Sequence, residues 1–402
     1  MIVGAGPCGS FSAFVAAKLG LAVVVCEKRE EIGVPVHCPG HLSVSGLKRL
    51  GLPLPAGIVE NEFRGAVFYS PSGREFMVRL DFPITCVVNR ELFDKHLAEL
   101  AIKAGAQYHL QSRVESLAFE RGFIKGVVVN HEGSRETLTS RMVIDAEGMS
   151  SALLKKAGLQ TLDRSMVVNA VQAKVEGPDD LDEDTVEVYL GQKYAPGLFA
   201  WIIPGRDGSA KIGLATKSRN PRDHLHRFMH NHPIASKKLA RSEIINLSLH
   251  PMTLGGPIPK TYSNGLLIVG DAASHVKPTT GGGVIFGLLS SKIAGEVAYE
   301  AIKTNDFSES FLSRYQSRWK AEIGFDLTVM CRIRKLLNRL SDKQLDKIIS
   351  LCSTLEVNTI LEEVGDLDFQ GKSLIRMVRH PGVLAVALYL LFSSLASGQV
   401  NI

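Results

Sequence analysis

The sequence predicts an α/β protein in which a parallel-sheet domain is interleaved with an antiparallel β-rich domain and followed by a helical C-terminal region. Three observations predict this class. Continuous apolar runs, typical of strands buried on both faces, end in glycine-containing or acidic turns at 2–9, 21–27, 143–148 and 266–271. Alternating apolar and polar residues dominate 63–88 and 165–257, and the pattern is helical and charged from residue 307. Three further helices are expected at Ser10–Leu19, Glu91–Ala104 and Gly281–Ala301.

The expected domain bounds follow from these patterns, because no internal repeat or low-complexity linker marks a boundary. We expect the parallel-sheet domain to comprise 1–62, 86–164 and 258–301, the β-rich domain 63–85 and 165–257, and the helical region 302–402. With 402 residues the chain is long enough to bury a full core. Its net charge of +5 suits an anionic ligand or an anionic membrane surface and is too diffuse to indicate nucleic acid.

Cysteine usage and the start of the chain bear on its location. The six cysteines form no CxxC pair and no cluster at zinc spacing, so we expect no metal site and free thiols in a reducing cytoplasm. The chain opens directly on a structural motif, with no segment that resembles a signal peptide. Only three residues precede Gly4, whereas a strand usually needs about five. A natural start upstream of Met1 therefore stays open.

The first motif is Gly4-x-Gly6-x-x-Gly9, between an expected strand and an expected helix. The first glycine permits a tight turn, the second lets the backbone approach a pyrophosphate, and the third lets the helix pack closely on the strand. Pro7 suits the first helical turn, where a missing N–H costs little. Glu27 ends the second strand about 20 residues later, where a carboxylate binds ribose hydroxyls. This combination predicts a dinucleotide site.

A second loop, near residue 270, narrows the dinucleotide to FAD. An expected strand ends in Gly270-Asp271, which brings a carboxylate beside the ribityl chain or the pyrophosphate. Pro278 and Gly281–Gly283 then open a long helix, whose free N–H groups stabilise negative charge on the flavin edge. A flexible glycine hinge is disfavoured by Asp271 upstream and the apolar helix downstream. Between the two loops, another expected strand ends at Asp145 in an acidic turn.

Together these segments resemble the aromatic-hydroxylase superfamily of flavoproteins, whose FAD domain is a Rossmann fold of the glutathione-reductase type. Within it the chain most resembles the geranylgeranyl reductase family, especially the archaeal membrane-lipid branch. The segments 27–38 and 270–283 carry the resemblance, and 88–94 is similar to a segment whose arginine contacts FAD. The residues then expected to bind FAD are Gly4, Gly6, Pro7, Gly9, Glu27, Lys28, Cys38, Arg90, Val114, Asp145, Gly270, Asp271, Pro278, Gly281, Gly282 and Gly283.

The same family covers its isoprenoid tunnel with a lid that reads Pro-x-x-Tyr-x-Trp-x-Phe-Pro. Here the matching stretch runs from Pro196 to Pro204, with Phe199 in place of the tyrosine and Ile203 in place of the phenylalanine. The resemblance therefore implies a lid that keeps its apolar character and lacks the tyrosine hydroxyl. From the residues alone this run is a β-strand with a buried tryptophan. The residues expected to bind substrate are Phe199, Trp201, Ile203 and Pro204.

The resemblance implies hydride transfer from reduced FAD to the double bonds of geranylgeranyl chains, with archaeal-type prenylated glycerophospholipids as substrates. An isolated alkene is a poor hydride acceptor, so we expect a coupled proton donor. Cys38 aligns with a family cysteine near the isoalloxazine ring, and His37 precedes it. The alternative for Cys38 is an inert small hydrophobe. His275 is a further candidate, although a hydrogen bond to its own loop is the stronger interpretation.

Two other functions stay open. One is a flavin-dependent monooxygenase or halogenase on the same fold. Halogenases carry a Trp-x-Trp-x-Ile-Pro segment, of which only Trp201 to Pro204 is matched here. The other is a prenyl-lipid-binding flavoprotein without catalysis. The reductase hypothesis needs an external electron donor, and ferredoxin, NAD(P)H and a deazaflavin are all compatible with the sequence.

The C-terminal region offers two candidates for contact with lipid. Val383–Leu395 is the most apolar run, shorter than the roughly 20 residues that a helix needs to cross a bilayer. It is either a buried helix or an interfacial one. The basic run Arg332–Lys335 is either a solvated helix face or a site for a lipid phosphate. Both features fit a cytoplasmic protein that is peripheral to the membrane.

Overall fold

The structure is a computed structural model that describes residues 1–364 and 366–398. The mixed α/β class predicted from the sequence, with its helical C-terminal region, is confirmed. The chain forms two compact units, each described by itself. Unit 1 comprises Met1–Val36, Arg90–Met166 and Thr253–Leu327, and unit 2 comprises His37–Asn89, Val167–Met252 and Thr328–Ile402.

The sequence groups 37–62 and 86–89 with the parallel sheet, whereas the structure groups them with unit 2. The reason is strand pairing. Three short strands from these segments form their own antiparallel sheet, in the order β3-β7-β4. These strands are β3 (His41–Ser43), β4 (Val59–Phe63) and β7 (Thr85–Val88), and α2 (Val44–Leu50) follows β3.

The six-stranded sheet of unit 1 has the order β18-β19-β12-β1-β2-β8, and all neighbours are parallel except β18 and β19. Its central strands are apolar and almost wholly buried, because both faces are covered. Parallel strands end at the same edge, so the loops that follow β1, β2, β12 and β19 meet there. The strands are β1 (Ile2–Val3), β2 (Val24–Cys26), β8 (Gln107–His109), β12 (Val143–Asp145), β18 (Tyr262–Ser263) and β19 (Leu266–Ile268).

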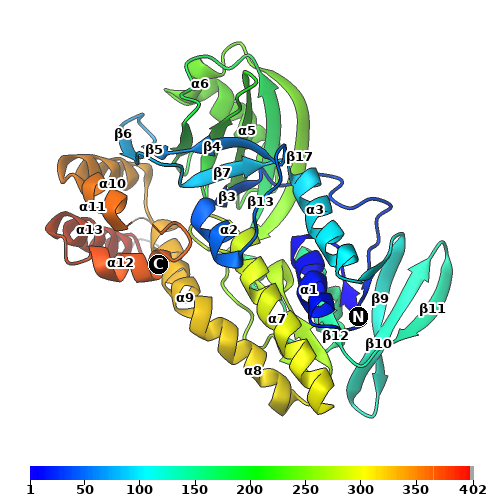
Figure 1. Cartoon of the computed structure of the whole chain (residues 1–402). Helices are drawn as coiled ribbons and strands as arrows, with labels where there is room; N and C mark the ends of the chain where they lie inside the picture. Colours follow the sequence, from blue (N-terminus) through cyan, green and yellow to red (C-terminus); the bar gives the residue numbers. More distant parts are fainter. Residues whose placement is uncertain (365, 399–402) are drawn as a thin grey trace. The chain divides into compact units, whose positions relative to one another are not determined.

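Helix α1 (Pro7–Lys18) of unit 1 packs against α3 (Arg90–Lys103) and α7 (Val284–Thr304) (Figure 1). The expected helix at Ser10–Leu19 begins at Pro7, because proline is favoured in the first turn. The helix expected from Gly281 begins only at Val284, because Gly281 has a φ of +77°. Unit 1 also contains β9 (Ser112–Glu120), β10 (Phe123–His131), β11 (Ser134–Thr139), α4 (Ala152–Lys156) and α8 (Glu309–Trp319).

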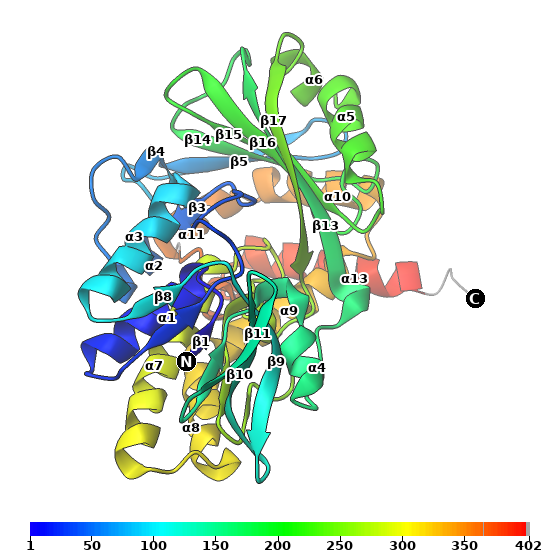
Figure 2. The same ribbon diagram turned by 90° about the vertical axis from the view of Figure 1, so that its right-hand side faces the viewer.

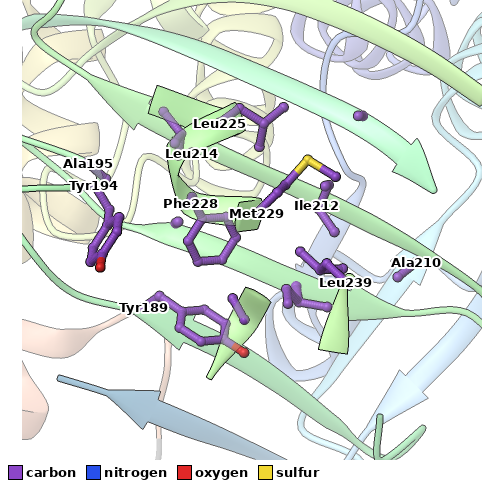
Figure 3. Close-up of a cluster of buried hydrophobic side chains, with 14 of the residues drawn as sticks. Tyr189, Tyr194, Ala195, Ala210, Ile212, Leu214, Leu225, Phe228, Met229 and Leu239 are labelled. Carbon is purple, nitrogen blue, oxygen red and sulfur yellow. The ribbon is translucent and has the colours of Figure 1, made fainter. Parts of the chain in front are cut away.

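Unit 2 is built on a seven-stranded sheet, mainly antiparallel, in the order β17-β13-β16-β15-β14-β5-β6 (Figure 2). Helices α5 (Pro221–Asn231) and α6 (Ala235–Lys238) pack on it through a cluster of aromatic and aliphatic side chains (Figure 3). The interpretation of 165–257 as mostly β misses these helices, although Asn220-Pro221 is a helix-start signal. The strands are β5 (Gly65–Tyr69), β6 (Glu75–Arg79), β13 (Val167–Glu176), β14 (Thr185–Tyr189), β15 (Ala200–Pro204), β16 (Ser209–Thr216) and β17 (Glu243–Thr253).

The C-terminal region is helical, as predicted. Arg332 and Lys335 on α9 (Phe325–Leu337) are exposed, whereas Arg334 is buried, so the basic run is not simply a solvated face. Burial lowers the pKa of Arg334 to about 10. Among the described residues, no single helix is long and apolar enough to cross a membrane; α12 and Pro381–Leu395 pass that test together, across a 116° bend. The remaining helices are α10 (Asp342–Thr354), α11 (Val357–Val364), α12 (Gln370–Met377) and α13 (Pro381–Gly398).

Candidate functional site

The glycine turn after β1 requires two of its three glycines for its own geometry. Gly4 has a φ of +93°, and a Cβ at this position would lie 2.6 Å from the Ala146 carbonyl oxygen. A Cβ at Gly9 would lie 1.8 Å from the Gly4 carbonyl oxygen. A Cβ at Gly6, by contrast, would meet nothing within 4 Å. Gly4 and Gly9 therefore shape the turn, while Gly6 borders open space at the N-terminus of α1.

Helix α1 presents an N-terminus that no side chain caps. Gly6 is the N-cap residue, Pro7 occupies the first turn, and that turn contains no acidic residue. Glu27 instead stabilises the preceding turn, because its Oε2 accepts a hydrogen bond from the Ala5 N–H (2.8 Å) and its Oε1 accepts one from the Arg29 N–H (3.0 Å). Each carboxylate oxygen can accept a further bond. Glu27 thus anchors the loop and keeps acceptors for a hydroxyl.

The second predicted loop packs directly on α1. A Cβ at Gly270 would lie 2.6 Å from the Cys8 Sγ, so only glycine allows this contact. Asp271 lies beside the N-terminus of α7, since a Cβ at Gly283 would be 3.0 Å from its Oδ1. Burial raises the pKa of Asp271, and the positive charge of Arg90 opposes that shift. The loops after β1 and β19 therefore converge at one edge of the sheet.

Arg90 and Asp145 are both held by contacts within unit 1. The Arg90 guanidinium donates two hydrogen bonds to the Asp94 carboxylate, 3.1 Å from Nε to Oδ1 and 3.0 Å from Nη2 to Oδ2. Burial raises the pKa of Asp94, against the effect of Arg90. Asp145 ends β12, and its Oδ1 accepts a bond from the Glu147 N–H (2.9 Å) while its buried Oδ2 has no partner. Burial and the neighbouring Glu147 raise the pKa of Asp145.

The other predicted FAD residues of unit 1 differ in environment. Lys28 is exposed, Pro278 is buried, and Val114 packs against the core around β9 and β10. His275 is completely buried 4.5 Å from the Trp319 ring, and both its ring nitrogens lack a hydrogen-bond partner. The expected side-chain hydrogen bond from His275 to its loop is therefore wrong. Burial lowers the pKa of His275 to about 3, so the ring is neutral.

These features fit a dinucleotide. Three features come from loops that follow neighbouring parallel strands and so lie at one edge of the sheet. They are the open space at Gly6, the N-termini of α1 and α7 without side-chain caps, and the unpartnered oxygen of Asp145. Backbone N–H groups at a helix N-terminus bind phosphate, and a buried acceptor such as Asp145 Oδ2 favours a hydroxyl or amide donor.

The predicted catalytic pair lies in unit 2. The His37 ring stacks on His250 of β17, with centroids 5.0 Å apart and planes at 12°. The Cys38 Sγ accepts a hydrogen bond from the Gly40 N–H at 3.4 Å. His250 also lines a surface pocket of about 430 Å³, together with Arg219 and Arg222. The sequence does not single out His250, because it stands alone in a strand far from His37 along the chain.

The four predicted substrate residues divide into two pairs. The rings of Phe199 and Trp201 are both half-buried and lie edge to face, with centroids 6.2 Å apart. Trp201 also covers Gly213, where a Cβ would lie 2.5 Å from its Cζ2. Ile203 is 4% exposed in a core cluster with Phe63, and the Pro204 carbonyl accepts a bond from Asn61 Nδ2 at 3.1 Å. Phe199 and Trp201 are thus the two that present ring surface.

The fold and these loops define the class as a dinucleotide-binding protein, and comparison with known proteins gives the cofactor and the family. Residues 1–288 match the family model described as FAD binding domain. The chain is 33% identical to digeranylgeranylglycerophospholipid reductase 2 of Methanopyrus kandleri, over 97% of this chain and 98% of that protein. A crystal structure of a geranylgeranyl bacteriochlorophyll reductase-like protein from Thermoplasma acidophilum has a TM-score of 0.85 at 30% identity, covering 97% of this chain and 98% of that one.

The chain belongs to the geranylgeranyl reductase family of FAD-binding proteins, in the digeranylgeranylglycerophospholipid reductase branch. The predicted family and FAD cofactor are thereby confirmed. A flavin-dependent brominase also matches, with a TM-score of 0.72 at 19% identity, covering 96% of each chain. That likeness shows a shared fold alone.

Proposed function

We infer that this chain is an FAD-dependent reductase that saturates carbon–carbon double bonds of geranylgeranyl chains in prenylated glycerophospholipids. The observation that carries this conclusion is the similarity to the Methanopyrus kandleri reductase over nearly the whole of both chains. Family membership also favours reduction over halogenation, because the brominase likeness extends only to the fold. A flavoprotein that only binds prenyl lipid is the alternative that a turnover assay excludes.

We propose that unit 1 holds FAD chiefly through its backbone. The N–H groups at the start of α1 receive the pyrophosphate across Gly6, and Glu27 accepts a ribose hydroxyl. The N-terminus of α7 stabilises negative charge on the flavin, with Asp271 beside it. Bound FAD supplies the hydride when it is reduced. Supporting positions in the same proposal are Gly4, Pro7, Gly9, Lys28, Cys38, Arg90, Val114, Asp145, Gly270, Pro278, Gly281, Gly282 and Gly283.

We propose that unit 2 binds the isoprenoid chain through Phe199 and Trp201. A geranylgeranyl chain offers no hydrogen-bond donor or acceptor, so recognition must come from apolar and aromatic surface. The edge-to-face pair supplies such surface, and Trp201 is fixed over Gly213. Ile203 and Pro204 support this pair through the strand that they share with Trp201.

We propose that Cys38 donates the proton that accompanies hydride transfer, with His37 beside it. Hydride addition to one alkene carbon requires a proton at the other, and a thiol can supply it. His275 does not suit this role, because it is fully buried and its pKa is lowered to about 3. The His37 ring stacks on His250.

We further propose that the electrons come from an external donor and that the enzyme works at a membrane surface from the cytoplasm. The flavin must be reduced again after each hydride transfer, so ferredoxin, NAD(P)H or a deazaflavin must reach it. The name of the relatives implies a glycerophospholipid substrate, and such lipids form membranes. Peripheral attachment would give the enzyme access to that lipid without a spanning helix.

The test is anaerobic turnover. The FAD-loaded protein is reduced with dithionite and incubated with a digeranylgeranylglycerophospholipid dispersed in detergent. The mass of the product is then measured by mass spectrometry. We expect a gain of roughly two mass units per reduced double bond. Gain of an oxygen in air without hydrogenation would overturn the reductase. Lipid binding with unchanged mass under anaerobic conditions would indicate the non-catalytic alternative.

A variant series tests the proton donor in the same assay. Cys38→Ala is expected to lower turnover about a hundredfold, a typical contribution of general acid catalysis, while Cys38→Ser retains part of it. Cys352→Ala is the matched control, because this thiol is also partly buried in unit 2 but lies in the C-terminal helical core. Equal turnover of Cys38→Ala and the control would reject the role of Cys38.

A further inference from the structure

Helix α13 at the C-terminus is largely apolar, on its exposed side as well as on its buried side. Ser393 and Ser394 are buried, Ser394 completely, whereas Phe392 is 65% exposed and Leu395 is 52% exposed. A helix on a water-soluble surface normally turns its apolar side inward. The outward side of α13 forms a continuous band, here called the exposed stripe. It consists of Leu384, Ala385, Leu388, Leu391, Phe392 and Leu395.

The opposite side of α13 is attached to the rest of unit 2. Val383 and Val386 belong to a core cluster with Ile349 of α10, and α13 lies alongside α10 (Figure 1). Gln344 of α10 donates a hydrogen bond from Nε2 to the Ser393 carbonyl (3.3 Å). The helix is therefore held on one side by protein and offers only the exposed stripe to a partner.

Positive charge gathers at the start of this helix. From Phe369 to the end of the chain, the sequence contains Lys372, Arg376 and Arg379 and no Asp or Glu. Arg376 and Arg379 are exposed, and so is the apolar side chain of Ile375 between them and Lys372. An apolar stripe bordered by basic residues without acids is complementary to a surface that is apolar inside and negatively charged outside.

We propose that α12 and the exposed stripe of α13 dock unit 2 onto a membrane surface that contains anionic lipids. The stripe enters the boundary between headgroups and acyl chains, and Arg376 and Arg379 contact lipid phosphates. This surface goes beyond the proposed function by naming the segment that makes the membrane contact. It rests on the proposed function in one respect, because the proposed lipid substrate lies in a membrane.

A membrane explains the stripe better than a second copy of the chain. Stable interfaces between proteins surround an apolar centre with a polar rim and usually carry about one hydrogen bond per 100–200 Å². Tyr389 is half-buried beside the exposed stripe, and the six side chains of the stripe itself carry no group that donates or accepts a hydrogen bond. Lipid acyl chains need none.

The experiment is vesicle flotation with the FAD-loaded full chain. Vesicles of phosphatidylglycerol and vesicles of phosphatidylcholine are compared, and bound protein is measured after centrifugation. We expect binding to phosphatidylglycerol. Leu388→Glu with Phe392→Glu should reduce it at least tenfold, through loss of apolar contact and repulsion. Arg376→Gln with Arg379→Gln should reduce it roughly twenty-fivefold, from about fivefold for each charge.

The control is Phe119→Glu, which places one glutamate on a similarly exposed phenylalanine of β9 in unit 1. Its binding should equal that of the unchanged chain. Equal binding of the stripe variant and the control would overturn the proposal, and so would the absence of binding to either vesicle. Equal binding of the unchanged chain to the two lipids would overturn the role of the charges. A dimer in sedimentation that the stripe variant converts to monomer would assign the stripe to a second copy.

Flotation requires no turnover, so its result is independent of the reductase activity. Hydrogenation of detergent-dispersed lipid provides the complementary measurement, because the detergent replaces the membrane. The stripe variant should hydrogenate that lipid as fast as the unchanged chain and should be slow only with lipid in vesicles. A chain that floats but hydrogenates no lipid contradicts the proposed function and leaves the docking surface supported.

Discussion

The FAD site of unit 1 and the lipid site proposed for unit 2 are built by opposite means. Unit 1 relies on main chain: Gly4 and Gly9 close a turn in which side chains would collide, and α1 and α7 present N-termini without side-chain caps. Unit 2 relies on side chains carried by strands, such as Phe199 and Trp201 on and beside β15. The difference teaches that a site made of backbone leaves glycines at fixed spacing in the sequence. A site made of side chains leaves only an alternating pattern that any strand shares.

A buried ion pair can be broken in each unit, and this is expected to have the largest effect. In unit 2, Lys238 contacts Glu187, which also accepts a hydrogen bond from the Tyr189 hydroxyl. Lys238→Met leaves a buried carboxylate unpaired and should lower the free energy of unfolding by about 3–5 kcal/mol. Urea unfolding followed by circular dichroism measures this. FAD affinity, measured by flavin fluorescence, should not change.

The counterpart in unit 1 is Arg90→Met, which removes the partner of the buried Asp94. It should cost a similar free energy of unfolding and, because Arg90 is proposed to contact FAD, should also weaken FAD binding. Asp94→Asn serves as the control, since it weakens the pair while it leaves the guanidinium in place. If Arg90→Met binds FAD as tightly as Lys238→Met, the proposed contact between Arg90 and FAD is wrong.

The glycine turn gives the next largest effect and separates folding from binding. Gly9→Ala places a Cβ against the Gly4 carbonyl and should cost about 3 kcal/mol of stability, with loss of FAD. Gly6→Ala meets open space, so its free energy of unfolding without FAD should stay within about 0.5 kcal/mol. It should nevertheless weaken FAD binding, because its methyl group occupies the proposed path of the pyrophosphate. Unchanged FAD affinity in Gly6→Ala would place the pyrophosphate elsewhere.

This contrast also explains how much could be predicted from the sequence. The turn at Gly4, the acid at Glu27 and the loop at Gly270 are local requirements of backbone geometry, so spacing alone located them. The stacking of His37 on His250 depends on which strand folds beside which loop, across more than 200 residues. No local pattern carries that information.

The errors have the same origin. Helix α5 lies inside a stretch interpreted as mostly β, because its apolar residues are few and its start signal, Asn220-Pro221, is short. His275 was expected to bond its loop, but burial against Trp319 leaves its nitrogens without partners. The basic run that contains Arg334 was interpreted as either a solvated face or a lipid-phosphate site, and tertiary packing buries Arg334. Each case was decided by contacts between segments distant in sequence.

The third prediction compares one buried histidine in each unit. Burial lowers the pKa of His275 to about 3 and that of His232 to about 4, whereas an unfolded histidine titrates near 6.5. Between these values the unfolded chain binds protons that the folded chain does not, so the free energy of unfolding must fall as pH drops below about 6.5. The expected slope is about 1.4 kcal/mol per pH unit for each histidine.

Urea unfolding at pH 7 and pH 5 measures this slope. The histidine contribution is complete at pH 7, and it is lost progressively toward the folded pKa values. His275→Phe should reduce the pH dependence of the free energy of unfolding of unit 1 alone. The fluorescence of bound FAD reports the unfolding of this unit. His226→Gln is the control, because His226 is exposed. An unchanged slope in His275→Phe would show that this ring is not neutral and buried in solution.

The smallest effect is expected at Phe199, which stands where the lid motif that 196–204 resembles has a tyrosine. The Phe199 ring lies edge to face with Trp201, and the proposed role of both rings is apolar contact with the isoprenoid chain. Phe199→Tyr keeps the ring and adds only a hydroxyl, so kcat/KM for lipid hydrogenation should change by less than about threefold. Phe199→Ala removes the ring and should lower kcat/KM roughly tenfold or more. A rise of tenfold or more in Phe199→Tyr would show that the family hydroxyl participates in the reaction and that this chain works without it at a cost in rate.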